Sequence, residues 1–335
     1  PQGPQGPQGA AGVQGPQGPA GTGGVSIQFN QIIWVDPNGN DTTAAAGSQG
    51  RFDLPFETIG GALDYLTTGS KTGWTIEVQA GVYSETDTLR VSSSNTGVTV
   101  HLSGGVSIQG ASGMSTKPQW SIAGDCSVTI IGDAPDGEYN QTQTSDGPLG
   151  GASIVSNGQG QEMFVFSGSA TAQQVNISNV SLIHPVASSP VPMFSYELGT
   201  GLTQERHIFN MTNCYVRQDN TTDNGLVMKT GSDYPARIII DIRETWFITQ
   251  RNNATMFSFA TVIGASKVVA LKLRDNMFYA AAVGAVAADT GFITTRATQG
   301  AEFYWYWQGN TFFSGGITGI TNNAKITEPQ YWNRS

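Results

Sequence analysis

Residues 208–216 read IFNMTNCYV, and their pattern returns four more times in the second half of the chain. In each copy a strand of alternating residues leads to one polar residue, and two or three large apolar residues follow it. The polar residues are 34, 32, 31 and 34 positions apart. Repeats of this length that consist of strands predict a solenoid of stacked parallel strands, because helical repeats of similar length need two helices per unit. The other copies are VNISNVSLI (175–183), IIIDIRETWFI (238–248), VVALKLRDNMFY (268–279) and FYWYWQGNTFF (303–313).

Asparagine occupies the polar position in four of the five copies, and Thr245 occupies it in the third. Asparagine tolerates the left-handed backbone conformation that turns a strand through a corner. Stacked at one corner, such residues can also hydrogen-bond along a ladder. We therefore predict structural turns at Asn179, Asn213, Asn276 and Asn310.

One convincing helix is predicted, at PFETIGGALDYL (55–66). Its apolar residues recur at the three- and four-residue spacing of a single helical face. We expect this helix to cap the N-terminal end of the solenoid, where the first strands would otherwise leave apolar side chains and an unpaired edge uncovered. After residue 73 the sequence predicts strands and turns only.

The first 24 residues follow a strict triplet pattern with glycine at every third place. Only glycine fits at the crowded axis of a collagen triple helix, and such a helix needs three chains. This segment therefore predicts a homotrimer. Proline follows glycine while the next position is glutamine or alanine, so the pattern does not depend on hydroxyproline. The glycines assigned to trimerisation are Gly3, Gly6, Gly9, Gly12, Gly15, Gly18, Gly21 and Gly24.

The predicted fold class is all-β: a single-stranded parallel β-helix with an N-terminal capping helix, preceded by a collagen-like stalk. The predicted parts are the stalk (1–24), a connecting strand and turn (25–54), the β-helix (55–315) and a C-terminal tail (316–335).

The charge of the chain restricts its partners. Only 12% of residues are charged and the formal net charge is −9, which a trimer would carry three times over. Binding of nucleic acid needs clustered lysine and arginine, so neither nucleic acid nor insertion into an anionic membrane is expected. No cofactor is predicted. The two cysteines, Cys126 and Cys214, are read as buried free thiols or as a disulfide.

Two family resemblances rest on quoted residues. Residues 32–86 contain the WVDPNGND turn, the PF-TI--AL helix and the I-V-AGVY strand, and this segment resembles the start of pectin-lyase-like right-handed parallel β-helices. The Gly-Pro-Gln triplets joined to β-structure resemble bacteriophage fibres and tailspikes. The resemblance implies a structural fibre on the virion surface, on head or tail, that attaches to a host-surface glycan or protein. Its partners would be itself and, through its N-terminal side, other virion proteins.

Two other functions stay open at this point. One is a surface protein of a bacterium or spore, where collagen-like stalks also occur. The other is a polysaccharide depolymerase of the tailspike kind, although the NTD, DD, HG and RIK motifs of related β-helix enzymes are absent. His101, His184 and His207 lie in unrelated surroundings, which favours surface positions on strands or loops over catalytic ones.

A glycoside hydrolase needs two carboxyl groups about 5–9.5 Å apart. The weak candidates are Asp219 and Asp223 in one loop, and Asp241 and Glu244 on the third repeat. On a strand the last two would face opposite sides unless the strand bends. Solvated carboxylates remain the simpler interpretation of all four. The same interpretation applies to Asp133, Asp136 and Glu138, which share the polar loop 132–151.

DPNGND (36–41) places Asp36, Asn38 and Asn40 at the odd positions of a calcium loop. Asp41 replaces the glycine expected at its sixth position and Gly47 replaces the final glutamate. We therefore predict no metal site there and assign these residues to side-chain turns.

The run FYWYW (303–307) is the strongest candidate contact surface. In a strand Phe303, Trp305 and Trp307 would share one side, and Tyr304 and Tyr306 the other. Exposed aromatic residues stack on sugar rings or pack against a neighbouring subunit. We therefore predict that the run 304–307 contributes a ligand or subunit contact.

Overall fold

The computed structural model describes Gly3 and residues 31–48, 50–111, 117–133, 151–156, 162–167, 172–185, 192–197, 206–218, 228–230, 237–249, 257–263, 268–280, 293–297 and 302–314. The chain divides into two units, Pro1–Asn30 and Gln31–Ser335. The predictions for the glycine triplets beyond Gly3, for Asp136, Glu138, Asp219 and Asp223, and for the tail 316–335 lie outside the described residues.

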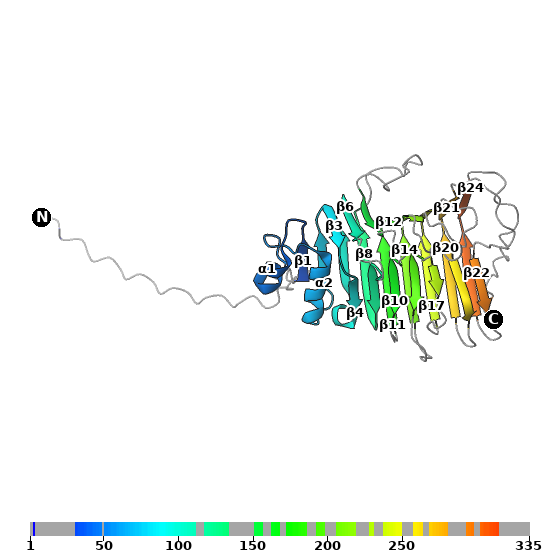
Figure 1. Cartoon of the computed structure of the whole chain (residues 1–335), viewed down its shortest axis with the longest axis horizontal. Coiled ribbons are helices and arrows are strands. Elements are labelled where there is room, and N and C mark those ends of the chain that lie inside the picture. Colours follow the sequence, from blue (N-terminus) through cyan, green and yellow to red (C-terminus); the bar gives the residue numbers. More distant parts are fainter. Residues whose placement is uncertain are drawn as a thin grey trace. The chain divides into compact units, whose positions relative to one another are not determined.

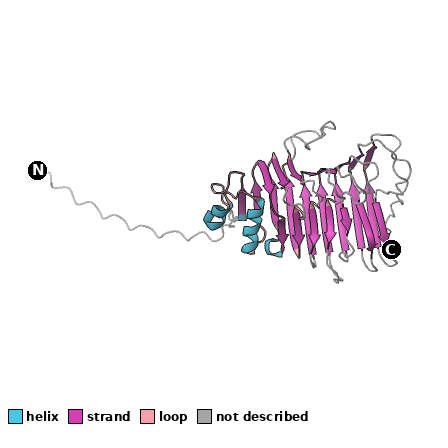
Figure 2. Cartoon of the chain, in the orientation of Figure 1, coloured by secondary structure: helices cyan, strands magenta, loops and turns pink. Residues whose placement is uncertain are grey.

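The second unit is built from three sheets of parallel strands. Figures 1 and 2 show these strands stacked side by side, in the order of the sequence. Sheet 1 contains β1 (Ile32–Val35), β2 (Thr75–Val78), β5 (Val98–Leu102), β8 (Cys126–Gly132), β11 (Ala172–Ser178), β14 (Arg206–Thr212), β17 (Arg237–Arg243), β20 (Val268–Arg274) and β23 (Glu302–Gln308). Sheet 2 contains β4 (Leu89–Ser92), β7 (Trp120–Ala123), β10 (Phe164–Ser167), β13 (Phe194–Glu197), β16 (Met228–Thr230), β19 (Phe257–Ile263) and β22 (Ile293–Ala297). Sheet 3 contains β3 (Gly81–Glu85), β6 (Val106–Gly110), β9 (Ala152–Val155), β12 (Val180–His184), β15 (Tyr215–Gln218), β18 (Trp246–Thr249), β21 (Met277–Ala280) and β24 (Thr311–Ser314).

The order of strands has one simple rule. After β1, neighbours within a sheet are three strands apart in the chain, and the strand pairs of all three sheets are parallel. The chain therefore visits the three sheets in turn and returns to each after one coil. The prediction of an all-β fold with parallel strands is confirmed, and this arrangement is consistent with a parallel β-helix.

A left-handed residue follows the sheet 1 strand in five successive coils, at the corner with sheet 3. In two of these coils the residue is Asn179 or Asn213, whose φ angles are 57° and 51°. At Asn276 and Asn310 the left-handed residue lies one position earlier, and the asparagine directly follows it. The remaining left-handed corner residues are Glu244 (φ 50°), Asp275 (φ 54°) and Gly309 (φ 64°).

Strand register explains this one-residue difference. Thr212 of β14 pairs with Arg243 of β17, which places Asn213 beside Glu244 and not beside Thr245. The asparagines still form side-chain ladders, but in two separate pieces. The Asn213 Nδ2 donates to the Asn179 Oδ1 over 2.9 Å, and the Asn276 Nδ2 donates to the Asn310 Oδ1 over 3.0 Å.

Replacing Glu244 with asparagine is expected to stabilise the protein by about 1 kcal/mol. Asparagine tolerates the left-handed backbone better than glutamate, and at this place it would lie next to Asn213 in register and could extend the ladder. The urea midpoint of unfolding measures the gain. Glu244→Ala is the control: it keeps the β-carbon and adds no hydrogen bond, so a gain of the same size in that variant would contradict the explanation.

The predicted helix exists as α2 (Ile59–Thr68), four residues later at its start than expected. The Asp41 Oδ1 accepts the backbone N–H groups of Glu57 and Thr58 over 2.8 and 3.0 Å, which holds this stretch extended. Thr58 then serves as the N-cap, and its hydroxyl accepts the N–H of Gly61 over 2.9 Å. A β-carbon on Gly61 would lie 2.5 Å from the Asp41 carboxyl carbon, so glycine allows this close approach.

Helix α2 buries the apolar face that its spacing predicts: Ile59, Ala62, Leu63 and Leu66. It lies beside β1 and the first coil strands at the N-terminal end of the strand stack (Figure 1). Three shorter helical turns accompany it, at Asp41–Thr43 (α1), Ala44–Ser48 and Ser93–Asn95.

The N-terminus of α2 is held by a buried carboxyl group. The Glu85 side chain, 3% exposed at the end of β3, accepts the N–H groups of Ile59 and Gly60 over 3.0 and 3.3 Å. Burial raises the pKa of Glu85 to about 7, and these two hydrogen bonds lower it only in part.

We expect Glu85 to make the cap sensitive to pH. A carboxyl group whose pKa is higher in the folded state contributes most stability when protonated in both states, and this contribution is lost as the pH rises from about 4.5 through about 7. The free energy of unfolding of wild type relative to Glu85→Gln should therefore fall by about 3 kcal/mol between pH 4.5 and pH 8. Urea titrations of both proteins at several pH values measure this. A difference that is constant with pH, or that grows toward pH 8, would contradict the assignment.

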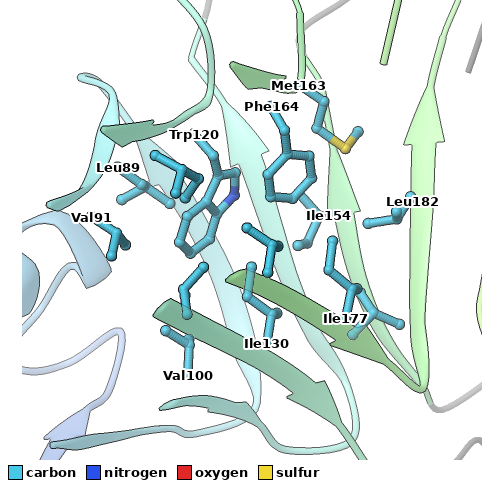
Figure 3. Close-up of a cluster of buried hydrophobic side chains, with 14 of the residues drawn as sticks. Leu89, Val91, Val100, Trp120, Ile130, Ile154, Met163, Phe164, Ile177 and Leu182 are labelled. Carbon is cyan, nitrogen blue, oxygen red and sulfur yellow. The ribbon is translucent and has the colours of Figure 1, made fainter. Parts of the chain in front are cut away.

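The core is one continuous column of apolar side chains inside the three sheets. In Figure 3 the Trp120 indole lies between Leu89 and Val91 on one side and Phe164 on the other. The rings of Trp120 and Phe164 stack at 5.8 Å between centroids, and Phe164 stacks on Phe194 at 5.1 Å. Because these residues pair in register on β7, β10 and β13, the aromatic row runs along the axis and joins successive coils.

Cys126 and Cys214 are both buried and both free, which supports the first of the two interpretations made from the sequence. Among the described residues, no helix has the length and apolar character needed to cross a membrane.

Candidate binding surface

The outward side of sheet 1 is the most informative surface of the described chain. Alternate residues of each strand point into the core, as Ile238, Ile240 and Ile242 do on β17. The residues between them therefore lie on the outer side, and the same alternation holds on β14 and β20. The parallel register stacks these outer residues into rows that cross the sheet from coil to coil.

Five cations gather on the outer side of three adjacent strands, although the whole chain has a net charge of −9. We call this surface, together with the neighbouring outer residues of β23, the cationic face. Its five cations are Arg206 on β14, Arg237 and Arg243 on β17, and Lys272 and Arg274 on β20.

Arg243 is exposed but binds Asp241, and three further cations are exposed: Arg206, Arg237 and Lys272. None of the three forms an ion pair with a carboxylate of the described chain. Arg206 and Arg237 are partners in register on neighbouring strands. They therefore form a pair of like charges about 5 Å apart at the backbone.

Three cations elsewhere on the chain have partners. Arg51 binds Asp53 over 3.1 Å, Lys117 binds Asp87 over 3.0 Å, and the Lys71 ammonium lies 3.9 Å from the centre of the Tyr65 ring. Arg206, Arg237 and Lys272 therefore differ from these three cations in having no charged or aromatic partner among the described residues.

Asp241 is the central carboxylate of this face and is 7% exposed. Its two oxygens accept from Arg243 over 3.0 and 2.8 Å, and Arg274 reaches the Oδ2 at 2.6 Å. Burial raises the pKa of Asp241, but the hydrogen bonds and charges of the two arginines outweigh it and hold the pKa below its ordinary value. Lys272 is the register partner of Asp241 but forms no ion pair with it, because the two arginines bind the carboxylate.

Asp241 and Glu244, the catalytic candidates on the third repeat, are not arranged as the two carboxyl groups of a glycoside hydrolase. Asp241 is bound by two guanidinium groups on the outer side of the sheet, whereas Glu244 is exposed at the left-handed corner. A general acid of a glycosidase needs a raised pKa, and Asp241 has a lowered one.

The aromatic run forms β23, next to β20. Tyr304 pairs with Ala270 and Tyr306 with Lys272, so both tyrosines occupy outer positions of the cationic face. Tyr306 is 47% exposed, and its hydroxyl donates to the Gln308 side chain. The backbone positions of Trp305 and Trp307 pair with Leu271 and Leu273, both of them core residues, and nothing further is described of the two tryptophan side chains.

An outer row of polar residues continues from the cationic face toward the N-terminus. The Asn210 Nδ2 donates to the Asn176 Oδ1 over 2.8 Å, and the Asn176 Nδ2 donates to the Thr129 hydroxyl over 3.2 Å. Between this row and the Arg206–Arg237 pair lie two half-buried apolar residues, Ile208 and Ile239. The outer side thus offers charge, amides and apolar surface in neighbouring rows.

Sequence reasoning missed a second polar cluster, on the first coils of sheet 1. His101 lies between Glu77 and Asp133, with its Nδ1 2.6 Å from the Glu77 Oε2 and its Nε2 3.0 Å from the Asp133 Oδ1. Partial burial lowers the pKa of His101, but the hydrogen bonds and charges of the two carboxylates outweigh this and raise it. The three residues are far apart in sequence, and only the register of β2, β5 and β8 brings them together.

The two other histidines are buried inside the fold. The Nδ1 of His207 lies 3.0 Å from the Gln173 Oε1, and burial lowers the pKa of His207 to about 4. His207 is therefore a neutral core residue at pH 7. The prediction that the histidines lie at the surface is wrong for His184 and His207.

The DPNGND segment forms side-chain turns and caps. The Asp36 Oδ1 accepts the backbone N–H of Asn38 over 2.8 Å, and the Asn40 Oδ1 accepts that of Thr43 over 3.0 Å. Asp41 holds the start of α2 as described above. These bonds assign the acidic and amide groups of the segment to the connection between β1 and the capping helix.

Comparison of the chain with protein-family models, with curated proteins and with solved structures finds no match.

Proposed function

We propose that the chain is a homotrimeric fibre protein of a bacteriophage virion, with a collagen-like shaft and a right-handed parallel β-helix as its head. The observation that carries the proposal is the run of eight uninterrupted glycine triplets directly before a long body of parallel strands. The triplets require three chains around one axis, and a solenoid supplies a stiff body for projection from a surface. Right-handed winding is the expected hand, because connections between parallel strands are right-handed in nearly all proteins.

The proposed role is attachment to the host surface. The cationic face gives each subunit a polar, partly aromatic surface with unpaired charge, and a trimer would present three copies of it. Three weak contacts that form together raise the effective affinity without a tight single site.

Sedimentation of the purified protein and competition for adsorption test this proposal. A trimeric mass, with phage adsorption to host cells that falls when free protein is added, is the expected result. Gly12→Val should loosen the stalk while the head stays trimeric. A monomer at micromolar concentration would overturn the homotrimer, and a trimer that leaves adsorption unchanged would overturn the attachment role.

One further assay separates the other functions. Release of new reducing ends from host capsule would identify a depolymerase. A gene neighbourhood without capsid or tail genes would favour a surface protein of a bacterium or spore.

A further inference from the structure

We propose that the cationic face binds an anionic polysaccharide, a chain of sugars that carry carboxylate or sulfate groups. This inference rests on the proposed attachment function and names the class of ligand.

The first support is the unpaired charge. Arg206, Arg237 and Lys272 are exposed on three adjacent strands and bind no carboxylate of the described chain. Keeping like charges close together without a partner is unfavourable, and an anion from outside relieves that repulsion.

The second support is the spacing of these charges. Lys272 lies four residues further along its strand than Val268, the register partner of Arg237. Four residues span about 13 Å, and three strands span about 10 Å. This area is too large for one small anion and suits an extended polymer that crosses several strands.

The third support is the chemistry between the cations. Half-buried Ile208 and Ile239 form an apolar strip, and Tyr306 is exposed next to Lys272. Sugar rings have apolar faces that pack on such residues, and their hydroxyl groups hydrogen-bond to amides such as Asn210.

The density of charge argues against nucleic acid as the occupant. Asp241 neutralises part of Arg243 and Arg274, and exposed Glu244 and Asp275 lie at the adjacent corner. A nucleic acid carries a charge on every nucleotide and needs a denser array of cations, whereas an acidic polysaccharide can carry fewer charges per length.

The experiment measures binding of the full chain to immobilised polygalacturonate, dextran sulfate and neutral dextran by interferometry. The test variant is Arg237→Glu/Lys272→Glu, and the matched control is Arg51→Glu/Lys117→Glu, which changes the net charge equally at exposed cations elsewhere.

We expect wild type and the control to bind at least one of the two anionic polymers and not neutral dextran. The test variant should bind at least about tenfold more weakly, and added salt should weaken wild-type binding. Tyr306→Ala should weaken binding to polygalacturonate while the trimer stays intact.

Four results would overturn the inference. These are binding to neither anionic polymer, equal losses in test and control variants, tighter binding to single-stranded DNA than to either polymer, or a smaller sedimenting species for the test variant. The last result would make the cationic face a contact between copies of the chain. If wild type still competes for host adsorption while binding neither polymer, the attachment function stands and only this ligand class fails.

Discussion

Replacing Phe194 with alanine is expected to lower the free energy of unfolding by about 3–5 kcal/mol. The Phe194 side chain is fully buried, and its ring lies 5.1 Å from the Phe164 ring and 4.9 Å from the Phe209 ring, centre to centre. Truncation removes contacts to both neighbouring coils and leaves a cavity between them. Because a solenoid gains much of its stability from the interfaces between adjacent coils, the loss at one interface should weaken the whole stack.

Urea unfolding followed by tryptophan fluorescence measures this loss, and Val82→Ala is the control. Val82 is an exposed strand residue on β3, 59% accessible to solvent, so its truncation should change the free energy of unfolding by less than about 0.5 kcal/mol. Equal effects of the two substitutions would show that the aromatic row does not hold the coils together.

Replacing Asn276 with alanine is expected to cost about 2–6 kcal/mol, because it strips hydrogen-bond partners from a buried corner. The Asn276 side chain is 1% exposed; its Oδ1 accepts the Thr245 N–H over 3.0 Å, and its Nδ2 donates to the Ile242 carbonyl over 3.0 Å. Both backbone groups would lose these bonds inside the protein, and each buried group left without a partner costs about 1–3 kcal/mol. The bond to Asn310 of the next coil would also be lost.

Asn176→Ala on the outer side of the same sheet is the matched control. Its side chain also bonds to residues of both neighbouring strands, Thr129 and Asn210, but these groups are partly exposed and can bind water instead. We expect a loss below about 1 kcal/mol. A similar loss for both variants, measured by urea unfolding, would contradict the importance of burial at the corner.

The corner residues show what a sequence repeat can and cannot place. The repeat located the five corners to within one residue, because a strand that ends at a turn leaves a local signal. The left-handed residue is Asn179 or Asn213 in the first two coils and lies one position before the polar residue of the repeat in the three later coils. The left-handed conformation there falls on Glu244, Asp275 and Gly309. Aspartate and glycine favour this conformation, whereas glutamate does not. At Glu244 the conformation follows from the register with the preceding coil, which places this residue beside Asn213.

The cationic face illustrates the same limit for function. The aromatic run was visible in the sequence, and the tyrosines do occupy the outer side of β23. Arg206, Arg237 and Lys272, however, are 31 and 35 residues apart in an acidic chain and gave no local pattern. Asp241 was named as a catalytic candidate because it is a carboxylate, and its two arginine partners became apparent only through the pairing of β17 with β20.

By itself the sequence determined the all-β class, the parallel stacking, the apolar face of the capping helix and the positions of the strands in the repeats. All of these follow from periodicity within short stretches of chain, because the alternation of a strand and the spacing of a helix are local properties. Only the tertiary structure decided which side chains meet across coils: the Glu77–His101–Asp133 cluster, the Asp241 ion pairs and the unpaired cations. The reason is that the coils differ in length by several residues, so neighbours in the stack depend on the backbone hydrogen bonds that set the register rather than on a fixed spacing in the sequence.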